Sequence, residues 1–94
     1  MRKLVWDSSF RRAFKGQTRN DRSLQEQILG ALDLLVADPF HPQLKTHKLK
    51  GRLEGMWACW VEYDCRIVFL FAPDPESGED AIVLVDLGSH DEVY

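Results

Sequence analysis

The sequence has 94 residues, of which 45% are hydrophobic and 29% charged, a composition that excludes a disordered chain. No apolar run approaches the roughly 18–20 residues that span a bilayer, and the apolar stretch near the N-terminus is too short for a signal peptide. We therefore expect one cytoplasmic domain covering residues 1–94.

Charge is distributed unevenly along the chain. Residues 1–55 carry eleven Lys and Arg against six Asp and Glu, a net charge of +5. Residues 56–94 carry one cation, Arg66, against nine acids, a net charge of −8. Such a split permits a face that binds a polyanion despite a total charge of −3. The alternative is that these charges only solvate the surface.

The cysteines and histidines do not have the spacing of metal ligands. Cys59 and Cys65 are six residues apart and form no CxxC pair, and His41 and His47 have no second pair of ligands at a suitable distance. We expect neither a metal nor another cofactor. In a cytoplasmic protein the two cysteines are expected to be reduced thiols.

The N-terminal third predicts one strand and two helices. An apolar stretch, Lys3–Trp6, precedes Asp7, Ser8 and Ser9, which are typical of a helix N-cap. Phe10 and Phe14 then share one face of a helix covering about residues 8–17. The second helix carries a wide apolar stripe and ends at Asp38-Pro39. Its start is marked by a capping-box pattern from Ser23 to Glu26, although Asp21 is also a suitable cap.

A loop rich in basic residues follows the second helix. We interpret His41, between two prolines, as a surface histidine without a chemical role. Four cations then arrive within eight residues, at Lys45, Lys48, Lys50 and Arg52. Most basic runs are solvated surface, but this one leads directly into the predicted sheet and is therefore a candidate for phosphate contact.

The C-terminal half predicts three strands, because β-branched and aromatic residues dominate three runs separated by polar breaks. These runs are 56–63, 66–71 and 81–87, with a tight turn at Asp64 between the first two. The element order is thus β-α-α-β-β-β. The second helix must bury its stripe against the sheet, which gives an α+β fold with two antiparallel helices on one face of a small antiparallel sheet.

Polar groups from distant parts of the chain are expected to meet at one end of this sheet. His47 stands at the entrance to the first of the three strands, and Asp64 and Arg66 stand at the turn. The last strand would deliver His90 and Tyr94 to the same end. Alternation in 56–63 does not decide which side faces the core, so Trp60 is either a core residue or a surface on which a base stacks.

Several short motifs occur in a fixed order: His47-x-Leu49-x-Gly51, Gly55-x-Trp57, Asp64-x-Arg66 and 88–94, Gly-Ser-His-Asp-Glu-Val-Tyr. In this order and spacing they resemble the RelE/ParE superfamily of bacterial toxins, and most of all its YafQ-type mRNA interferases. The resemblance covers nearly the whole chain. It implies a RelE-like fold, cleavage of mRNA in the A site of the translating ribosome, and silencing by a cognate antitoxin.

The resemblance also implies site residues. By position it assigns catalysis to His47, Asp64, His90 and Tyr94, and Arg66 resembles an arginine that many RelE-type members carry after the turn. Trp60 stands where YafQ has a histidine, so it can stack on a base but cannot transfer a proton. Taken together, the basic run, the aromatic Trp60 and this arginine give an expected substrate-binding set of Lys45, Lys48, Lys50, Arg52, Trp60 and Arg66.

These groups suit metal-independent RNA cleavage, which needs a base for the 2′-OH proton, positive charge at the phosphate and an acid for the leaving oxygen. Histidine suits either proton-transfer role at neutral pH. We expect His47 and His90 as a base–acid pair, with Asp64 as base or as the group that orients a histidine. The tyrosine Tyr94 offers a flat ring for stacking and a hydroxyl.

Alternatives remain for each group and for the whole protein. Structural roles would be a loop cap for His47, turn stabilisation for Asp64, an ion pair of Arg66 with an acid near the turn, and closure of the core for Tyr94. Whole-protein alternatives are a ParE-like gyrase poison, or a protein of the same fold with little or no nuclease activity that acts by binding its antitoxin.

Overall fold

The computed structural model describes residues 2–89 as a five-stranded sheet with two α-helices. Two short 3₁₀ turns, η1 and η2, lie in the loop after the second helix. The elements in chain order are β1 Lys3–Trp6, α1 Ser8–Thr18, α2 Arg22–Ala37, η1 Pro42–Leu44, β2 His47–Lys48, η2 Gly51–Leu53, β3 Trp57–Glu62, β4 Cys65–Pro73 and β5 Asp80–Gly88.

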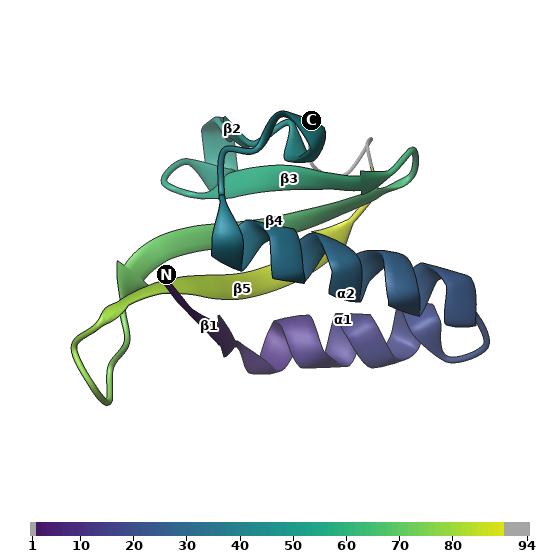
Figure 1. Ribbon diagram of the computed structural model, residues 1–94, viewed down its shortest axis with the longest axis horizontal. Helices are drawn as coiled ribbons and strands as arrows, with labels where there is room; N and C mark the ends of the chain where they lie inside the picture. The colour runs from purple at the N-terminus through teal and green to yellow at the C-terminus, as the bar shows by residue number, and fades with distance from the viewer. Residues whose placement is uncertain (1, 90–94) are drawn as a thin grey trace.

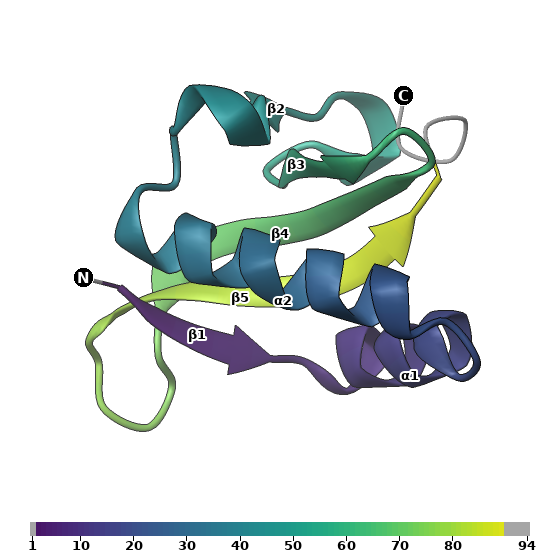
Figure 2. The ribbon, with the colours of Figure 1, turned by 45° about the vertical axis from the view of Figure 1, so that its right-hand side comes forward.

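The strands lie in the order β1-β5-β4-β3-β2, and the two helices run antiparallel on one face of the sheet (Figure 1). Figure 2 shows the same layers after a turn of the molecule, with β1 alongside β5. Neighbouring strands are antiparallel except β1 and β5, which are parallel. The predicted α+β class, the helix pair on one face and the pairing of the last two strands are confirmed.

Two features of the sheet differ from the sequence prediction. β1 pairs in parallel with β5, whereas a wholly antiparallel sheet was expected. The loop that carries Lys45, Lys48, Lys50 and Arg52 is called the basic loop. A two-residue strand, β2, lies within it and pairs with the start of β3. Alternation of apolar residues fixes which way side chains point but carries no information on strand direction. A pair of residues is also too short to give a periodic signal.

Each helix begins at an aspartate. The Asp7 carboxylate accepts hydrogen bonds from the Ser9 N–H (3.2 Å) and the Ser9 hydroxyl (2.6 Å), which confirms the predicted start of α1. Asp21 Oδ1 accepts from the N–H of Leu24 at 3.0 Å and caps α2. The capping box starting at Ser23 is therefore wrong, because the aspartate two residues earlier already satisfies that end of the helix.

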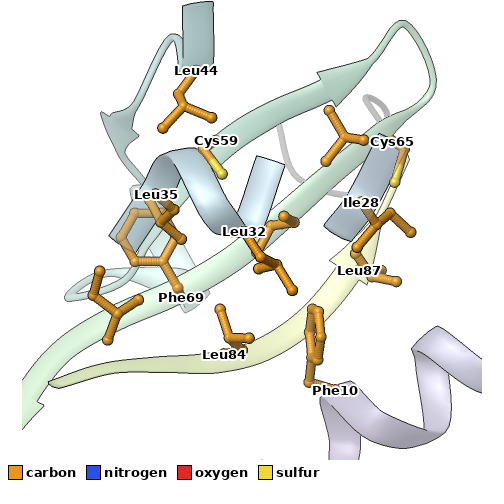
Figure 3. Packing of buried hydrophobic residues seen from close by; sticks show 13 residues of the cluster. Phe10, Ile28, Leu32, Leu35, Leu44, Cys59, Cys65, Phe69, Leu84 and Leu87 are labelled. Atoms are coloured by element: carbon orange, nitrogen blue, oxygen red, sulfur yellow. The ribbon is translucent and has the colours of Figure 1, made fainter. Parts of the chain in front are cut away.

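The main core lies between the helices and the sheet (Figure 3). Phe10, Ile28, Leu35 and Phe69 are completely buried there, together with the thiol-bearing Cys59. Each large apolar side chain buried in this way contributes about 1.5–3 kcal/mol relative to an exposed one. Cys59 belongs to this cluster, so the side of β3 that holds Cys59 faces the helices, which the sequence left open.

A smaller apolar cluster lies on the opposite face of the sheet, which we call the open face. Leu49, Ala58 and Val68 are buried in it, and Leu53 and Met56 of the basic loop pack against them. The N–H of Leu49 also donates to the carbonyl of Met56 at 3.0 Å. These contacts hold the basic loop against the open face.

Asp74 connects the loop between β4 and β5 to the first strand. Its side chain is 5% exposed, and its Oδ2 accepts from Lys3 Nζ (2.7 Å) and from the Ser77 hydroxyl (3.0 Å). The hydrogen bond from Lys3, together with the backbone N–H of Glu76, lowers the pKa of Asp74 below its ordinary value. The pKa of Lys3 is raised by the same pair.

Asp74→Asn is therefore expected to destabilise the protein only where the carboxylate is ionised. A folded-state pKa below the unfolded value of about 3.9 adds stability above pH 4, and this is lost as the pH falls through the folded pKa. The difference in free energy of unfolding between wild type and Asp74→Asn should be constant from pH 5 to 7 and should shrink as the pH falls below about 4. Urea denaturation at each pH measures it. Asp33→Asn, at an exposed position on α2, is the control; a difference that persists unchanged to pH 2 would contradict the assignment.

Candidate nucleic-acid interface

His47 points to the open face of the sheet. It is registered with Ala58 of β3, and cross-strand partners project to the same side. The basic loop can reach this position because Lys45, at φ 50°, reverses the chain after η1, while Gly51 and Gly55 adopt φ of 70° and 93° in the following turns. The left-handed conformation of Lys45 is unusual for a residue with a side chain.

The hydrogen bond of His47 defines its tautomer. Its Nδ1 lies 3.0 Å from the carbonyl oxygen of Lys45. A carbonyl only accepts, so Nδ1 carries the proton, and Nε2 is the basic nitrogen of the neutral ring. Nε2 is shielded from solvent. A role in capping the loop would use Nδ1, and a role as a base would use Nε2, so the two roles depend on different nitrogens of the ring.

Trp60 and Arg66 lie next to the apolar cluster on the open face. They are registered with each other, and each lies two residues along its strand from a residue of the open-face cluster. Trp60 is half-buried, and Lys45 Nζ lies 5.3 Å from the centroid of its ring. A hollow of about 420 Å³ runs beside Trp60, between the end of β3, α2 and η1. Trp60 is thus a partly accessible aromatic with a cation over it.

The guanidinium of Arg66 holds the turn between β3 and β4. Arg66 is 7% exposed, and its Nη1 donates to the carbonyls of Glu62 (2.6 Å), Tyr63 (3.0 Å) and Cys65 (3.2 Å). A buried cation is stable only when its donors are satisfied in this way. The contacts assign Arg66 a role in fixing the turn, and the predicted role in binding substrate stays a prediction.

Asp64 and His47 lie at opposite ends of β3. His47 is registered with Ala58, whereas Asp64 is exposed in the turn that follows Glu62, where its N–H donates to Glu62 Oε1 at 3.0 Å. From Ala58 to Glu62 alone a strand advances about 13 Å. The sequence predicted that these two groups meet at one end of the sheet, and the structure does not bring them together.

The predicted phosphate-binding cations separate onto different sides of the molecule. Lys45 accompanies Trp60, but Lys48 is registered with Trp57 and lies with its Nζ 5.5 Å from the centroid of that ring, on the helix side. Lys50 and Arg52 are exposed on the basic loop. Alternation along β2 sends Lys48 to the side opposite His47.

His90 and Tyr94 lie outside the described residues, so their predicted roles are untested. The end of β5 is described: Gly88 is registered with Arg66. The chain therefore leaves β5 at the end of the sheet that carries the β3–β4 turn and Asp64.

Both cysteines are free thiols buried in the main core. Burial raises the pKa of Cys59 to about 12 and that of Cys65 to about 11. At pH 7 the thiolate fraction of either residue is on the order of 10⁻⁴ or less, and the thiolate is the reactive species.

We expect the folded protein to react with a maleimide at least about 100-fold more slowly than a free cysteine, and two thiols per chain to react at once after unfolding in urea. Mass spectrometry of quenched reactions measures the extent of labelling. Rapid labelling of either residue in the native state would show that the core opens far more readily than this packing implies.

Two exposed aromatic residues were not singled out by the sequence prediction. Tyr63 is 83% exposed, because β3 ends at Glu62 and Tyr63 falls in the turn beside Asp64. Phe40 is 55% exposed in the loop after α2. The only sequence signal was their place beside polar or proline breaks, where a strand or helix cannot continue.

Within residues 2–89, no three His, Cys, Asp or Glu side chains are placed to hold a metal ion together. Among the helices of this part, none combines the length and apolar character that crossing a membrane requires.

The sequence model of the bacterial type II toxin–antitoxin toxin YafQ matches residues 2–94. This chain belongs to the YafQ toxin family. The family thus confirms the resemblance on which the site prediction was based. No curated protein is significantly similar in sequence.

Solved structures of YafQ-family and related toxins have the same fold. A copper-bound mutant toxin from Helicobacter pylori is 31% identical, with both chains covered completely and a TM-score of 0.68. A YoeB/ParE toxin from Agrobacterium tumefaciens is 23% identical over 94% of this chain and 98% of its own, with a TM-score of 0.76. The E. coli DinJ–YafQ complex contains a chain that is 14% identical over 100% and 99%, with a TM-score of 0.74.

Proposed function

We propose that this YafQ-family toxin is an endonuclease that cuts mRNA in the A site of the ribosome without a metal. The observation that carries the proposal is the open face of the sheet. It gathers His47 and Trp60, and the basic loop borders it with Lys45. A base, an aromatic surface and a cation beside one another are groups that RNA cleavage and base stacking need.

His47 is proposed as the base that accepts the 2′-OH proton. Its Nδ1–H points to the Lys45 carbonyl, which leaves Nε2 as the nitrogen that takes up a proton. The cleavage then proceeds by attack of the 2′-oxygen on the adjacent phosphate, and an acid protonates the departing 5′-oxygen. Because Nε2 is shielded from solvent, the substrate must displace neighbouring groups to reach it.

His90 is proposed as the acid and Tyr94 as a ring that stacks on a base. Asp64 is given no step at the phosphate, because it lies at the opposite end of β3 from His47, the proposed base. Gly88 is registered with Arg66, and Arg66 with Trp60, which lies two residues along β3 from the partner of His47; this register supports a place for His90 near the same site. Phosphates beside the cut would lie along the basic loop.

The proposed protein partner is a cognate antitoxin with an acidic segment. DinJ and YafQ of E. coli form a complex, and residues 1–55 of this chain carry a net charge of +5 that an acidic segment would neutralise. An antitoxin that covers the basic loop would block access to the open face.

A second candidate function is binding without cleavage. It is favoured by Trp60, which cannot transfer a proton, and by the separation of His47 from Asp64. In this case the open face would bind RNA, or a protein such as gyrase, without cleaving it.

Primer extension on mRNA after induction separates these candidates. With wild type we expect discrete cuts that depend on translation, and with His90→Ala the cuts should fall by about 10²–10⁴-fold, the contribution of one proton-transfer group. Growth arrest without mRNA cuts would overturn the nuclease proposal. Broken DNA in place of blocked translation would indicate a gyrase poison.

A further inference from the structure

A row of aromatic rings crosses the helix side of the sheet at the end away from the β3–β4 turn. Phe40 packs on Phe71 with centroids 5.9 Å apart and planes at 27°, and it meets the edge of Trp57 at 5.4 Å. Trp57 and Phe71 meet each other at 5.5 Å. We call these three residues, with the cations beside them, the aromatic row.

Each end of the aromatic row carries a cation. The guanidinium carbon of Arg2 lies 5.0 Å from the centroid of Phe71, and Lys48 Nζ lies 5.5 Å from that of Trp57. Arg2 precedes β1 and Lys48 belongs to β2, and these are the two edge strands of the sheet. Because the Phe71 and Trp57 centroids are 5.5 Å apart, these contacts place the two charged groups at most about 16 Å from each other.

One face of Phe40 remains available. Its ring stacks on Phe71 with one side, and 55% of the residue is exposed. Trp57 and Phe71 are partly buried against the main core and so hold Phe40 from below. An aromatic of this size on the surface, supported by rings and flanked by cations, has no role in closing the core.

We infer that the aromatic row binds unpaired nucleotides of RNA, with a base stacked on the outer face of Phe40 and phosphates near Arg2 and Lys48. Aromatic side chains beside a positively charged track are the common means of holding single strands without reading their sequence. A stacked strand advances about 3.4 Å per nucleotide, so the row would match at most about five stacked nucleotides, or fewer extended ones. Two acids also lie nearby: Asp38 accepts a hydrogen bond from the N–H of Phe40 at 3.3 Å, and Asp80 lines the same hollow as Arg2.

The basic loop links this surface to the candidate cleavage face. His47 and Lys48 are consecutive and project to opposite sides of the sheet. RNA that passes the loop could therefore contact the open face with one segment and the aromatic row with the next. The inference rests on the proposed function only in taking RNA as the ligand; it does not require cleavage.

Fluorescence anisotropy with a labelled ten-nucleotide 2′-O-methyl oligouridine tests it. This probe lacks the 2′-OH and cannot be cut, so binding is measured independently of the nuclease proposal. Phe40→Ala should raise Kd about 5- to 150-fold, the range measured for loss of one stacked base. The matched control is Leu29→Ala, since Leu29 is an exposed apolar residue on α2 (40% exposed) and should leave Kd unchanged.

The cations have a separate signature in the salt dependence. Replacing Arg2 and Lys48 together by glutamine should lower the slope of log Kd against log salt by about 1.4, because each phosphate contact on a single strand contributes about 0.7. Lys15→Gln, on α1, should leave the slope within about 0.7 of wild type. Circular dichroism melts of all variants verify that they fold.

The inference is overturned if Phe40→Ala binds the oligouridine within twofold of wild type, if Leu29→Ala weakens binding as much, or if wild type does not bind it at all. The inference is also overturned if Phe40→Ala loses as much affinity for double-stranded RNA as for the oligouridine, because paired bases cannot stack on Phe40. If mRNA is cut but Phe40→Ala does not weaken binding, the nuclease proposal stands and only RNA binding by the aromatic row is rejected. If Phe40→Ala weakens binding but mRNA is not cut, RNA binding by the aromatic row stands and the nuclease proposal is rejected.

Discussion

His47→Ala is expected to lower the rate of mRNA cleavage by about 10²–10⁴-fold while leaving the protein folded. The reason is the arrangement of the ring: Nδ1 is engaged with the Lys45 carbonyl, and Nε2 is the nitrogen assigned to the 2′-OH proton. Single-turnover cleavage of mRNA on programmed ribosomes, with toxin in excess, measures the chemical step apart from product release.

His47→Asn separates the catalytic role from the loop cap. The asparagine amide nitrogen stands about where Nδ1 does and can donate to the same carbonyl, but it offers no counterpart of Nε2. We therefore expect Asn and Ala at position 47 to be equally inactive. Activity close to wild type in the Asn variant would show that His47 only holds the loop. His41→Asn is the matched control, because His41 Nδ1 accepts from the Gln43 N–H at 3.1 Å and an asparagine oxygen can do the same.

Phe69→Ala should have the largest effect on stability. Phe69 is completely buried, is registered with Trp57 on one side and Leu84 on the other, and meets the edge of Phe71 at 5.4 Å. Truncating a buried phenylalanine typically costs about 3–5 kcal/mol, out of a total of about 5–15 kcal/mol for a small domain. Urea denaturation followed by tryptophan fluorescence measures the change in free energy of unfolding.

Two further variants test this explanation. Phe69→Leu refills most of the volume, so it should recover more than half of the lost free energy. Phe40→Ala removes an exposed ring and should cost about 1 kcal/mol, mainly its contacts with the other rings. If Phe40→Ala and Phe69→Ala lower the free energy of unfolding equally, burial does not explain the contribution of Phe69.

The candidate site was only partly predictable from the sequence. Residue types and order indicated RNA chemistry and the family, because histidines, a turn aspartate and a basic run recur at characteristic spacings. They also suggested a single pocket, which the structure divides: Asp64 lies at the far end of β3 from His47. Distance along a strand is set by register, and register depends on the two-residue strand β2, which no sequence period reveals.

What the sequence determined by itself is the two helices, four of the five strands and their order, since apolar periodicity and local capping depend on neighbouring residues. Short motifs at fixed spacings indicated the family. Only the tertiary structure decided that β1 runs parallel to β5 and that the Cys59 side of β3 faces the helices. It also placed His47 and Lys48 on opposite sides of the sheet and assembled the aromatic row from three separate segments. These outcomes depend on which strands pair and in which register, and that is fixed by contacts between residues far apart in the chain.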